Sequence, residues 1–523
     1  MSNPPQSMSP PGATNPADGS PLDPVTASSV ADVYAAIAGA RAAQSAWAAR
    51  SLDERAASAL ALGRALIERR ADIAAILSKE TGRSVTECLM SEVVTGVSYA
   101  KGAVRAARAA LATETIKLSP LEFPGKKVVV EAVPRGVVGI IAPWNYPLGN
   151  FMKSLFPALL AGNGVVLKPS EHTPRSGAWL AKLCAEIFPA GLVQVVHGDG
   201  SVGGAVIEGG VDAIVFTGSV PTGRKVSVLA AERLIPCSVE LGGKDAAIVL
   251  ADCDLDRTVA GVGYWALHNC GHNCAAVERV YVENAIADRF VERLTALVGK
   301  VRVNQDGSGR AVADIGPVQN AAQLAIIEAH VQDATTRGAK VLCGGARTGV
   351  GLGFAPTVLD RCDESMRVVA EETFGPVVAI VRVNDAEEAV RRANDTRYGL
   401  NGSVWTRDLA RGAQLARRLE VGVALVNNHA MTGILPEAPW TGVRETGTGV
   451  ASSRHAYPVF VRRRTVLVDS SRAPDPFWFP ADETLAELAD TVARMQLGSL
   501  GAAFRAMGLL RKRVQAITAL ARG

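Results

Sequence analysis

Two thiols and two imidazoles lie within seven residues of each other in the stretch HNCGHNCAAVERVYV, residues 268–282. Cys270 and Cys274 are four residues apart, and His268 and His272 each precede one of them by two positions. A thiolate can act as a nucleophile or bind a metal, and two neighbouring thiols can form a disulfide. The stretch is therefore compatible with a catalytic nucleophile, a zinc site or a redox pair. Motifs elsewhere in the chain are needed to decide between these three functions.

The zinc reading fits the spacing poorly. All four ligands would crowd into seven residues, and no distant Cys-x-x-Cys or histidine pair completes a usual zinc pattern, so we predict no metal. A Cys270–Cys274 disulfide stays open as an oxidised form, because this spacing lets the Cα atoms approach to about 5.5 Å. His272 could serve Cys274 as a base, but side chains two positions apart diverge in the expected geometry, which favours a structural or solvating role.

The composition is that of an ordinary globular protein. Of 523 residues, 48% are hydrophobic and 20% are charged, and the net charge of +4 is too small to indicate nucleic acid as a partner. The eight cysteines are scattered, which suits a reducing compartment, and no apolar run reaches the roughly 18 residues of a membrane-spanning helix. Residues 1–27 are rich in Pro, Ser and Gly, so we expect a disordered leader on a cytoplasmic protein.

Strand-like and helix-like segments alternate over most of the chain. Residues 28–111 space their apolar residues as helices do, for example at Leu60, Leu66 and Ile73. Strand-like runs follow and begin again after Asp245: KKVVVEAVP, GVVGIIAP, GVVLKPS, LVQVVHG and AIVFTGS, then DAAIVL, RVYVE, AKVLCGG, VVAIVRV and GVALVNN. This alternation, with continuous Val and Ile runs, predicts an α/β fold with two doubly wound parallel sheets in two domains.

Turns after three of these runs could hold a dinucleotide. GDGSVG at 198–203 fits the G-x-G-x-x-G pattern, but no acidic residue follows about 20 positions later, so a plain tight turn stays open. FTGSVPTG at 216–223 is the better phosphate candidate. There Gly218, Ser219 and Gly223 stand at the start of an expected helix, whose free N–H groups and dipole favour an anion.

The third turn, LKPSE at 167–171, offers contacts to a ribose. Lys168 and Glu171 can each hydrogen-bond ribose hydroxyls at the end of their strand. A carboxylate at Glu171 would also repel a 2′-phosphate, which favours NAD over NADP.

These motifs, in this order, resemble the aldehyde dehydrogenase superfamily over residues 25–469. The resemblance is carried by PWNYPL (143–148), LKPSE, FTGSVPTG, ELGGKDAAIV (240–249), CGHNCAAVERVYV, EETFGPV (371–377) and PWTGVRETGTG (439–449). It implies NAD(P)-dependent, non-acylating oxidation of an aldehyde to a carboxylic acid. Such chemistry needs a thiolate, donors for an oxyanion, a hydride acceptor and a base that activates water.

The resemblance implies three catalytic residues. Cys274 matches the nucleophile, since GHNC at 271–274 fits the family's Gly-Gln-x-Cys with His in place of Gln, and Cys270 is then a packed thiol. Asn145 matches the oxyanion donor, which works with the backbone N–H of Cys274, and a helix-capping role is compatible with this. Glu240 matches the base for thioester hydrolysis, and a plain salt-bridge partner is the alternative.

Further matches concern the cofactor. Glu372 in EETFGPV resembles the carboxylate that holds the nicotinamide ribose, Phe374 the ring beside the nicotinamide, and Trp144 a residue of the cofactor cleft. The implied cofactor is NAD, with NADP as the alternative. The chain departs from the family at Ala451, where many members carry a proton-relaying glutamate.

The resemblance also implies how the chain is organised. It implies a NAD-binding domain of 28–115 with 135–245, a catalytic domain of 246–455, and oligomerisation strands at 116–134 and 456–470. Residues 471–523 continue beyond the resemblance, and their helical spacing of apolar residues predicts a helical C-terminal extension. The strands imply a homodimer or tetramer. The extension is amphipathic and basic after Asp490, so it could form a peripheral membrane helix, an active-site lid, or helices packed on the body or a partner subunit.

Three other functions stay open at this point. A CoA-acylating aldehyde dehydrogenase would use the same thiol, but such relatives usually lack a glutamate at position 240. A catalytically silent structural protein would not need Cys274, Glu240 and Asn145 together, and a thiol esterase would work without cofactor. By family position the substrate tunnel draws on Asn150, Lys153, Asn273, His429, Met431, Ile434 and Trp440, whose apolar members favour an apolar or aromatic aldehyde.

Overall fold

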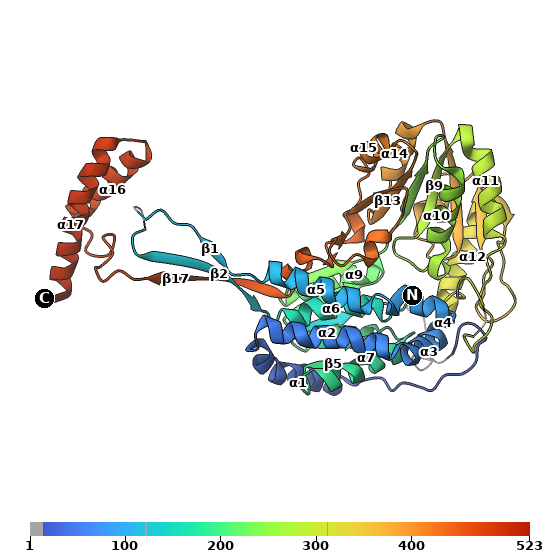
Figure 1. Ribbon diagram of the computed structural model, residues 1–523, viewed down its shortest axis with the longest axis horizontal. Coiled ribbons are helices and arrows are strands. Elements are labelled where there is room, and N and C mark those ends of the chain that lie inside the picture. The colour runs from blue at the N-terminus through green and yellow to red at the C-terminus, as the bar shows by residue number, and fades with distance from the viewer. Residues whose placement is uncertain (1–13, 121–122, 311, 523) are drawn as a thin grey trace, which may run out of the picture. The chain divides into compact units, whose positions relative to one another are not determined.

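The computed structural model describes residues 14–120, 123–310 and 312–522, and the chain forms two compact units (Figure 1). Unit 1 contains the residues up to Leu111 together with Val133–Arg462, and unit 2 contains Ala112–Ala132 together with the residues from Arg463 onward. The predicted α/β class with parallel sheets is confirmed, as the strands of both main sheets show.

The first sheet of unit 1 has five parallel strands in the order β5-β4-β3-β6-β7. The strands are β3 (Val137–Ile141), β4 (Gly164–Lys168), β5 (Val193–Val195), β6 (Ala213–Thr217) and β7 (Cys237–Glu240). β3 and β4 are buried along their whole length, as expected for parallel strands covered on both faces. The chain runs outward from β3 in both directions, so the strand order reverses between β3 and β6, where doubly wound folds bind ligands.

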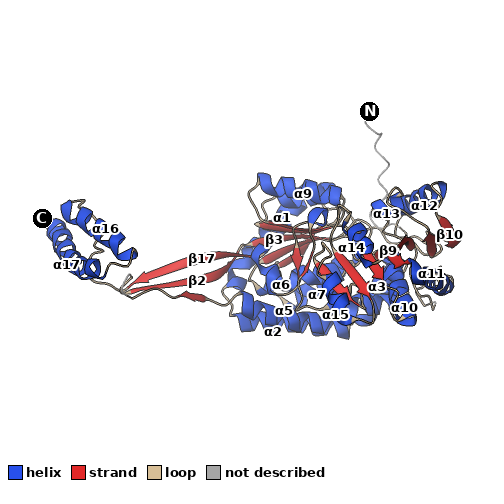
Figure 2. Cartoon of the chain, turned by 90° about the horizontal axis from the view of Figure 1, so that it is seen from above, coloured by secondary structure: helices blue, strands red, loops and turns tan. Residues whose placement is uncertain are grey.

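Helices cover both faces of this sheet (Figure 2). The helices that contact its strands are α1 (Val30–Ala48), α6 (Gly149–Leu160), α7 (Pro174–Ile187), α8 (Gly200–Glu208) and α9 (Val220–Glu232). The helices α2 (Leu52–Glu68), α3 (Arg70–Thr81), α4 (Val85–Cys88) and α5 (Gly96–Ala110) pack on other helices. α1 and α2 each begin with a capping box, Ser29 with Asp32 and Ser51 with Glu54, which satisfies the first free N–H groups. The buried Trp47 indole donates to the Leu159 carbonyl oxygen over 2.8 Å and ties α1 to α6.

The second sheet of unit 1 has seven strands in the order β10-β11-β12-β9-β8-β13-β14. The strands are β8 (Asp245–Val249), β9 (Val277–Glu283), β10 (Lys340–Cys343), β11 (Thr357–Asp360), β12 (Val377–Val383), β13 (Asn401–Trp405) and β14 (Val423–Val426). All pairs are parallel except β10 with β11, so the expected parallel run AKVLCGG is instead an antiparallel edge strand with an irregular register. An edge strand has only one neighbour and tolerates this.

The remaining helices of the second half are α10 (Leu255–Leu267), α11 (Asn284–Val298), α12 (Ala321–Thr336), α13 (Arg367–Ala370), α14 (Ala386–Asn394) and α15 (Leu409–Ala416). Two short strands, β15 (Trp440–Thr441) and β16 (Val450–Ala451), pair antiparallel. One hydrophobic core joins these helices to the second sheet, with Tyr281, Phe290 and Ile380 fully buried.

Unit 2 contains most of a three-stranded sheet and two helices. β1 (Glu114–Ile116) pairs antiparallel with β2 (Lys126–Pro134), and the sheet order is β1-β2-β17, with β17 at Val461–Asp469. The helices α16 (Glu483–Gln496) and α17 (Leu500–Arg522) occupy the predicted C-terminal extension.

The described part of the expected disordered leader, residues 14–27, differs from that expectation. Asn15 and Ala17 are buried, and the Asn15 amide donates to the Gly307 carbonyl oxygen over 3.1 Å. The Pro16 carbonyl oxygen accepts from the Leu352 N–H over 2.9 Å. A few backbone and amide hydrogen bonds therefore fix a segment whose composition predicts disorder, and residues 1–13 of the leader lie outside the described residues.

Candidate active site

A cleft of about 240 Å³ opens at the point where the strand order of the first sheet reverses. Parallel strands end at the same edge, so the turns after β3 and β6 face each other there. The residues that line the cleft are Pro143, Trp144, Asn145, Thr217, Gly218, Ser219, Leu241, Gly242, Cys274, Gln323, Ile326, Glu372 and Phe374. The cleft thus brings the candidate nucleophile Cys274 together with most of the predicted cofactor residues.

The loop between α10 and β9 distinguishes the two thiols. Asn269 and Cys270 both adopt the left-handed conformation, with φ of 56° and 57°, in a tight turn that precedes Cys274. Cys270 is 1% exposed and belongs to the hydrophobic core of the second half, whereas Cys274 is partly exposed and lines the cleft. Both are free thiols, so the geometry gives Cys274 access to a substrate and leaves Cys270 packed.

The Cys274 thiol is held in its neutral form by its surroundings. Removal from water raises the pKa of the Cys274 thiol to about 12, and the nearby acidic groups of Asp245, Glu240 and Glu372 add to this. The Lys153 ammonium acts in the opposite direction and lowers this pKa. A thiolate at position 274 therefore depends on positive charge close by.

Lys153 reaches the site from α6. Its Nζ lies 5.3 Å from the centre of the Trp440 ring, and Trp440 packs in the same apolar cluster as Cys274. Burial alone would lower the pKa of Lys153, but Tyr99, Glu240 and Cys274 outweigh it and raise this pKa. Lys153 is therefore a cation whose charge acts on the thiol, whereas the sequence placed it only among the tunnel residues.

Asn145 follows β3 and is fixed from two sides. Its Nδ2 donates to the His272 carbonyl oxygen over 3.0 Å, and its Oδ1 accepts from the Asn150 amide over 3.2 Å. One N–H of the Asn145 amide is left, and within the described residues the backbone N–H of Cys274 donates to no acceptor. Two N–H donors beside one sulfur could stabilise an oxyanion.

Glu240 ends β7 at the same edge of the sheet but does not line the cleft. Removal from water raises the pKa of Glu240 to about 7, and Lys153 opposes this rise. A carboxyl group with a pKa near neutrality can accept and release protons at the pH of the cell. The predicted salt-bridge alternative has no support, because no ion pair of Glu240 occurs in the described part of the chain.

Lys168 and Glu171 lie at the end of the neighbouring strand β4. The Lys168 Nζ is 3.5 Å from Glu171 Oε2, which also accepts from the Ser170 hydroxyl over 3.4 Å. Burial lowers the pKa of Lys168, while Glu171 and Asp199 counteract this. The two side chains lie together beside the cleft without lining it, in a position that suits contacts to an extended ligand.

The turn after β6 fits an anion. Ser219 is the N-cap of α9, but its side chain makes no capping hydrogen bond and instead donates to Thr222 Oγ1 over 3.1 Å. The first N–H groups of α9 are thus left for a ligand, together with Gly218 in the cleft wall.

Gly223, which the sequence also assigned to the cofactor, does not line the cleft. A Cβ there would lie 2.3 Å from Leu241 Cδ2, so the glycine lets α9 pack closely against Leu241. GDGSVG at 198–203 does not line the cleft.

The loop with Glu372 and Phe374 forms the opposite wall. Glu372 Oε1 accepts from the Gly243 N–H over 3.0 Å, and a Cβ on Gly242 would lie 2.1 Å from Glu372 Oε2. Burial, with a further contribution from Glu278, raises the pKa of Glu372 to about 8. Glycines at this point of ELGGK therefore make room for the carboxyl group.

A buried ion pair that the sequence did not reveal supports this loop. Glu278 accepts from the backbone N–H groups of Thr373 and Phe374, each over 2.8 Å, and pairs with Lys244. Phe374 itself has a φ of 49°, which is uncommon for a bulky residue. Glu278 and Lys244 are almost fully buried, so each charge is stabilised by the other. The Glu278 carboxylate also fixes the loop through its two backbone hydrogen bonds.

Three rings pack next to the thiol. The centroid of His272 lies 4.8 Å from that of Trp144 and 5.8 Å from that of Phe374, and Trp144 lies 5.4 Å from Phe374. Burial lowers the pKa of His272 to about 3, so the imidazole is neutral. His272 is therefore a buried ring packed against Trp144 and Phe374, an arrangement compatible with the structural role expected from the sequence.

The fold is that of the aldehyde dehydrogenases, and the chain belongs to this family: the model of the aldehyde dehydrogenase family matches residues 6–466. A 4,4′-diapolycopene aldehyde oxidase of Methylomonas is 35% identical over 470 residues, 90% of this chain and 88% of the relative. A Mycobacterium tuberculosis protein with the provisional name NADP+ succinate-semialdehyde dehydrogenase is 37% identical over 492 residues, which are 91% of this chain and 93% of that relative. The structure of betaine aldehyde dehydrogenase from Staphylococcus aureus in complex with NAD+ has a TM-score of 0.82 and 29% identity, and covers 90% of this chain and 93% of that one.

Proposed function

We propose that this protein oxidises an aldehyde to a carboxylic acid with NAD+ or NADP+, and that Cys274 is the nucleophile. The observation that carries the proposal is the cleft itself, which is lined by Cys274, Asn145, Glu372 and the residues that begin α9. A partly exposed thiol beside two free N–H donors and a phosphate-type helix start is an arrangement that packing alone does not need.

The cofactor would be held by residues that fit it. The uncapped start of α9 suits a pyrophosphate, Lys168 and Glu171 suit a ribose, and Glu372 suits a second ribose. When bound, the cofactor accepts a hydride from the substrate. The Glu171 carboxylate favours NAD+, and the relatives include proteins named or solved with either NAD+ or NADP+.

Cys274 and Asn145 carry the first step. The thiolate of Cys274 forms a C–S bond with the aldehyde carbon, and the C=O electron pair moves onto oxygen. The Asn145 amide and the Cys274 N–H stabilise that oxyanion. When the C=O bond re-forms, the hydride leaves and the substrate remains as a thioester on Cys274.

Glu240 carries the second step. Its carboxylate takes a proton from water, the resulting hydroxide attacks the thioester carbon, and the C–S bond breaks to release the acid and the thiolate. Glu240 must be deprotonated for this, and its pKa of about 7 places that form at neutral and alkaline pH. A CoA-acylating reaction would need no such base.

The substrate we propose is an apolar or aromatic aldehyde. Trp440 packs in the cluster that contains Cys274, and Gly433 of the short helix at Met431–Ile434 lies against the Trp440 ring. Met431 and Ile434 are exposed on that helix.

We also infer a homodimer or tetramer through the sheet β1-β2-β17, whose strands β1 and β17 expose most of their residues.

The test is an assay of NADH and NADPH formation with a panel of aliphatic and aromatic aldehydes, in the presence and absence of CoA. We expect activity without CoA, and loss of all activity in Cys274→Ala with cofactor affinity retained, measured by calorimetry. Turnover by Cys274→Ala would contradict the nucleophile, and a strict need for CoA would contradict the hydrolytic step.

A further inference from the structure

The helix pair α16–α17 folds around its own small core. Leu488, Ala506 and Leu509 are buried between the helices. The guanidinium of Arg513 is fully buried and donates to the carbonyl oxygens of Pro476 over 3.0 Å and Trp478 over 2.5 Å, and it pairs with Asp482. The segment before α16 is therefore tied to α17, and the aromatic residues it carries are held in place.

This helix pair leaves an unusual amount of apolar surface outside its core. Trp478 and Phe479 in the tied segment are 60% and 83% exposed, and Leu500 and Phe504 of α17 are 81% and 75% exposed. Leu500, Phe504 and Met507 have the i, i+4, i+7 spacing that places side chains on one face of a helix. The buried residues of α17 lie on the opposite face. Clustered exposed side chains of this kind mark a surface that contacts an apolar partner.

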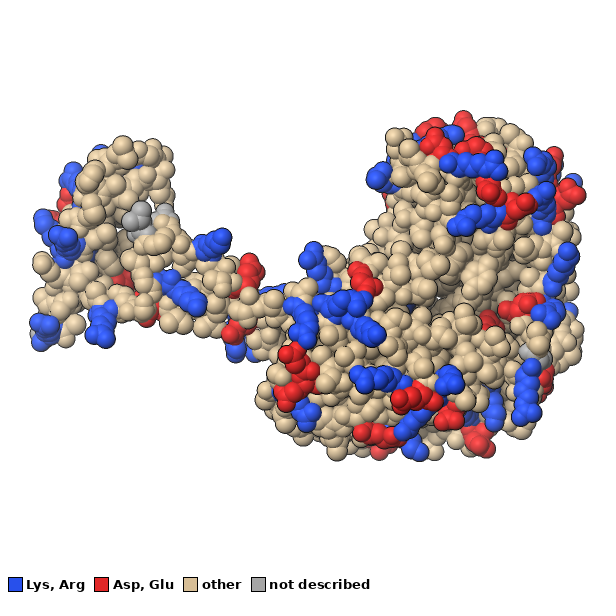
Figure 3. All heavy atoms as spheres, viewed as in Figure 1, with Lys and Arg blue, Asp and Glu red and all other residues tan. Residues whose placement is uncertain are grey.

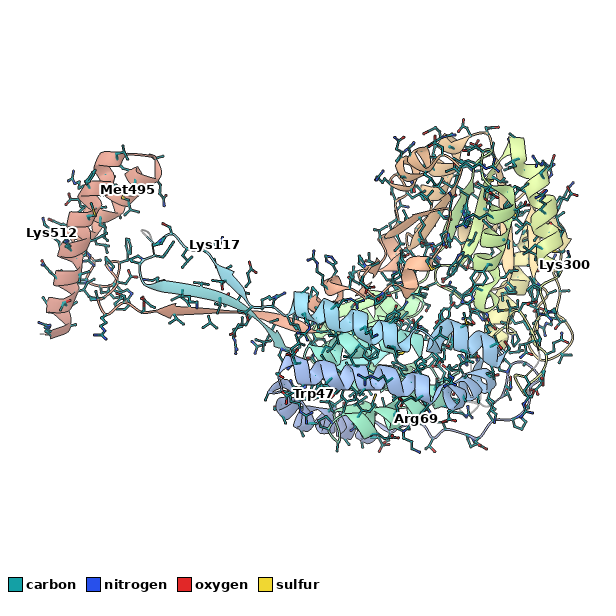
Figure 4. All side chains as sticks on the ribbon, in the orientation of Figure 1. Trp47, Arg69, Lys117, Lys300, Met495 and Lys512 are labelled. Carbon is teal, nitrogen blue, oxygen red and sulfur yellow. The ribbon has the colours of Figure 1, made fainter. Side chains whose placement is uncertain are left out.

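Cations accompany the apolar face. No acidic residue follows Asp490 in the sequence, and Arg511, Lys512 and Arg522 of α17 have no carboxylate partner among residues 14–522 that the structure describes. Figure 3 shows Lys and Arg side chains along the left edge of this helix pair, and Figure 4 places Met495 and Lys512 at its surface.

We propose that the helix pair α16–α17 binds the surface of an anionic lipid bilayer. Aromatic side chains on an irregular segment enter the interface between headgroups and acyl chains, and unpaired cations bind anionic headgroups. A second copy of the helix pair is a poorer occupant, because it would bring the unpaired cations of two α17 helices together. Among the residues that the structure describes, we find no helix with the length and apolarity of a membrane span. The family match ends at residue 466, so the helix pair lies outside the part of the chain that this match covers.

The experiment is flotation of the full-length protein with vesicles of phosphatidylcholine, with and without phosphatidylglycerol. We expect binding to the anionic vesicles only, weakened at least about thirtyfold in Arg511→Glu/Lys512→Glu, because two cations are lost and two anions are added. Leu500→Gln/Phe504→Gln should also release the protein, while both variants keep their melting temperature. Lys300→Glu/Arg289→Glu is the matched control, because it makes the same charge change on exposed residues of unit 1 and should bind as the parent does.

Three results would overturn the proposal. They are absence of binding to anionic vesicles, equal weakening by the control pair, and a change of oligomeric state in Leu500→Gln/Phe504→Gln, which would mean that a second copy covers the face. None of them depends on dehydrogenase activity, so failure here is distinct from failure of the proposed function.

Discussion

At the scale of single residues, the main difficulty is how a thiol largely removed from water, yet open to the cleft, becomes a nucleophile. The surroundings raise the pKa of Cys274 to about 12, so very little thiolate exists near neutral pH unless a cation offsets them. Lys153 is the cation that lowers this pKa, and it stands over Trp440 in the same cluster as the thiol. Activation of Cys274 is therefore expected to depend on Lys153.

Replacing Lys153 with Met should slow the alkylation of Cys274. Without the Lys153 cation, which lowers the pKa of the Cys274 thiol, less thiolate is present at every pH below that pKa, so the labelling rate should fall about tenfold. The measurement is the pH dependence of iodoacetamide labelling of the Cys274 peptide. Lys153→Arg should retain most of the parental rate, and a rate in Lys153→Met equal to the parent's would exclude Lys153 as the activating cation.

Replacing Asn145 with Ala should lower kcat/KM by about 10²–10³, because one oxyanion donor is lost. Cofactor affinity should stay within about threefold. The control is Asn150→Ala, which removes the hydrogen bond to Asn145 Oδ1 but keeps both N–H groups of Asn145, and it should cost much less. Equal losses in the two variants would assign Asn145 a purely structural role.

Much of the site could be predicted from sequence because its chemical groups lie in short local motifs. Cys274, Asn145 and Glu372 each stand in a turn after or before a strand, and the structure brings all three to one cleft. Lys153 and Glu278 could not be assigned a function in this way, because their partners lie on segments far away along the chain.

At the scale of elements, the edge of the first sheet arranges the site. β3, β4, β6 and β7 end at one edge, which places the PWN turn, LKPSE, the FTGS turn and Glu240 near each other. The sequence indicated the apolar strands but missed β7, β11 and β13, which are four or five residues long and contain polar residues. Such strands carry too little periodicity to stand out.

The loop with Phe374 depends on β9 through Glu278. Glu278→Gln would leave the buried Lys244 ammonium without its counter-charge and replace one acceptor with a donor, so we expect a loss of about 3–5 kcal/mol in unfolding free energy. A raised KM for the cofactor should accompany it. Urea denaturation and steady-state kinetics measure both.

The control for that variant is Glu387→Gln. Glu387 pairs with Arg418 on the surface, where an ion pair contributes about 1 kcal/mol or less. If Glu278→Gln were no more destabilising than Glu387→Gln, the buried pair would not be what holds the loop.

At the scale of the whole molecule, two compact units serve separate tasks in this account. Unit 1 contains the cleft and both parallel sheets, and unit 2 contains the exposed strands and the helix pair α16–α17. The alternation of strand-like and helix-like runs predicted the α/β class, whereas composition alone predicted disorder for residues 14–27, where contacts to Gly307 and Leu352 decide the structure. Tertiary contacts of this kind leave no local pattern in a sequence.

The central claim, that the reaction passes through a thioester on Cys274, is tested most directly with Glu240→Gln. This variant should complete one burst of NADH formation and then turn over slowly, since water is no longer activated. Mass spectrometry of the stopped reaction should find the acyl group of the aldehyde on the Cys274 peptide. NADH formation with an unmodified Cys274, or with the acyl group on another residue, would contradict the account.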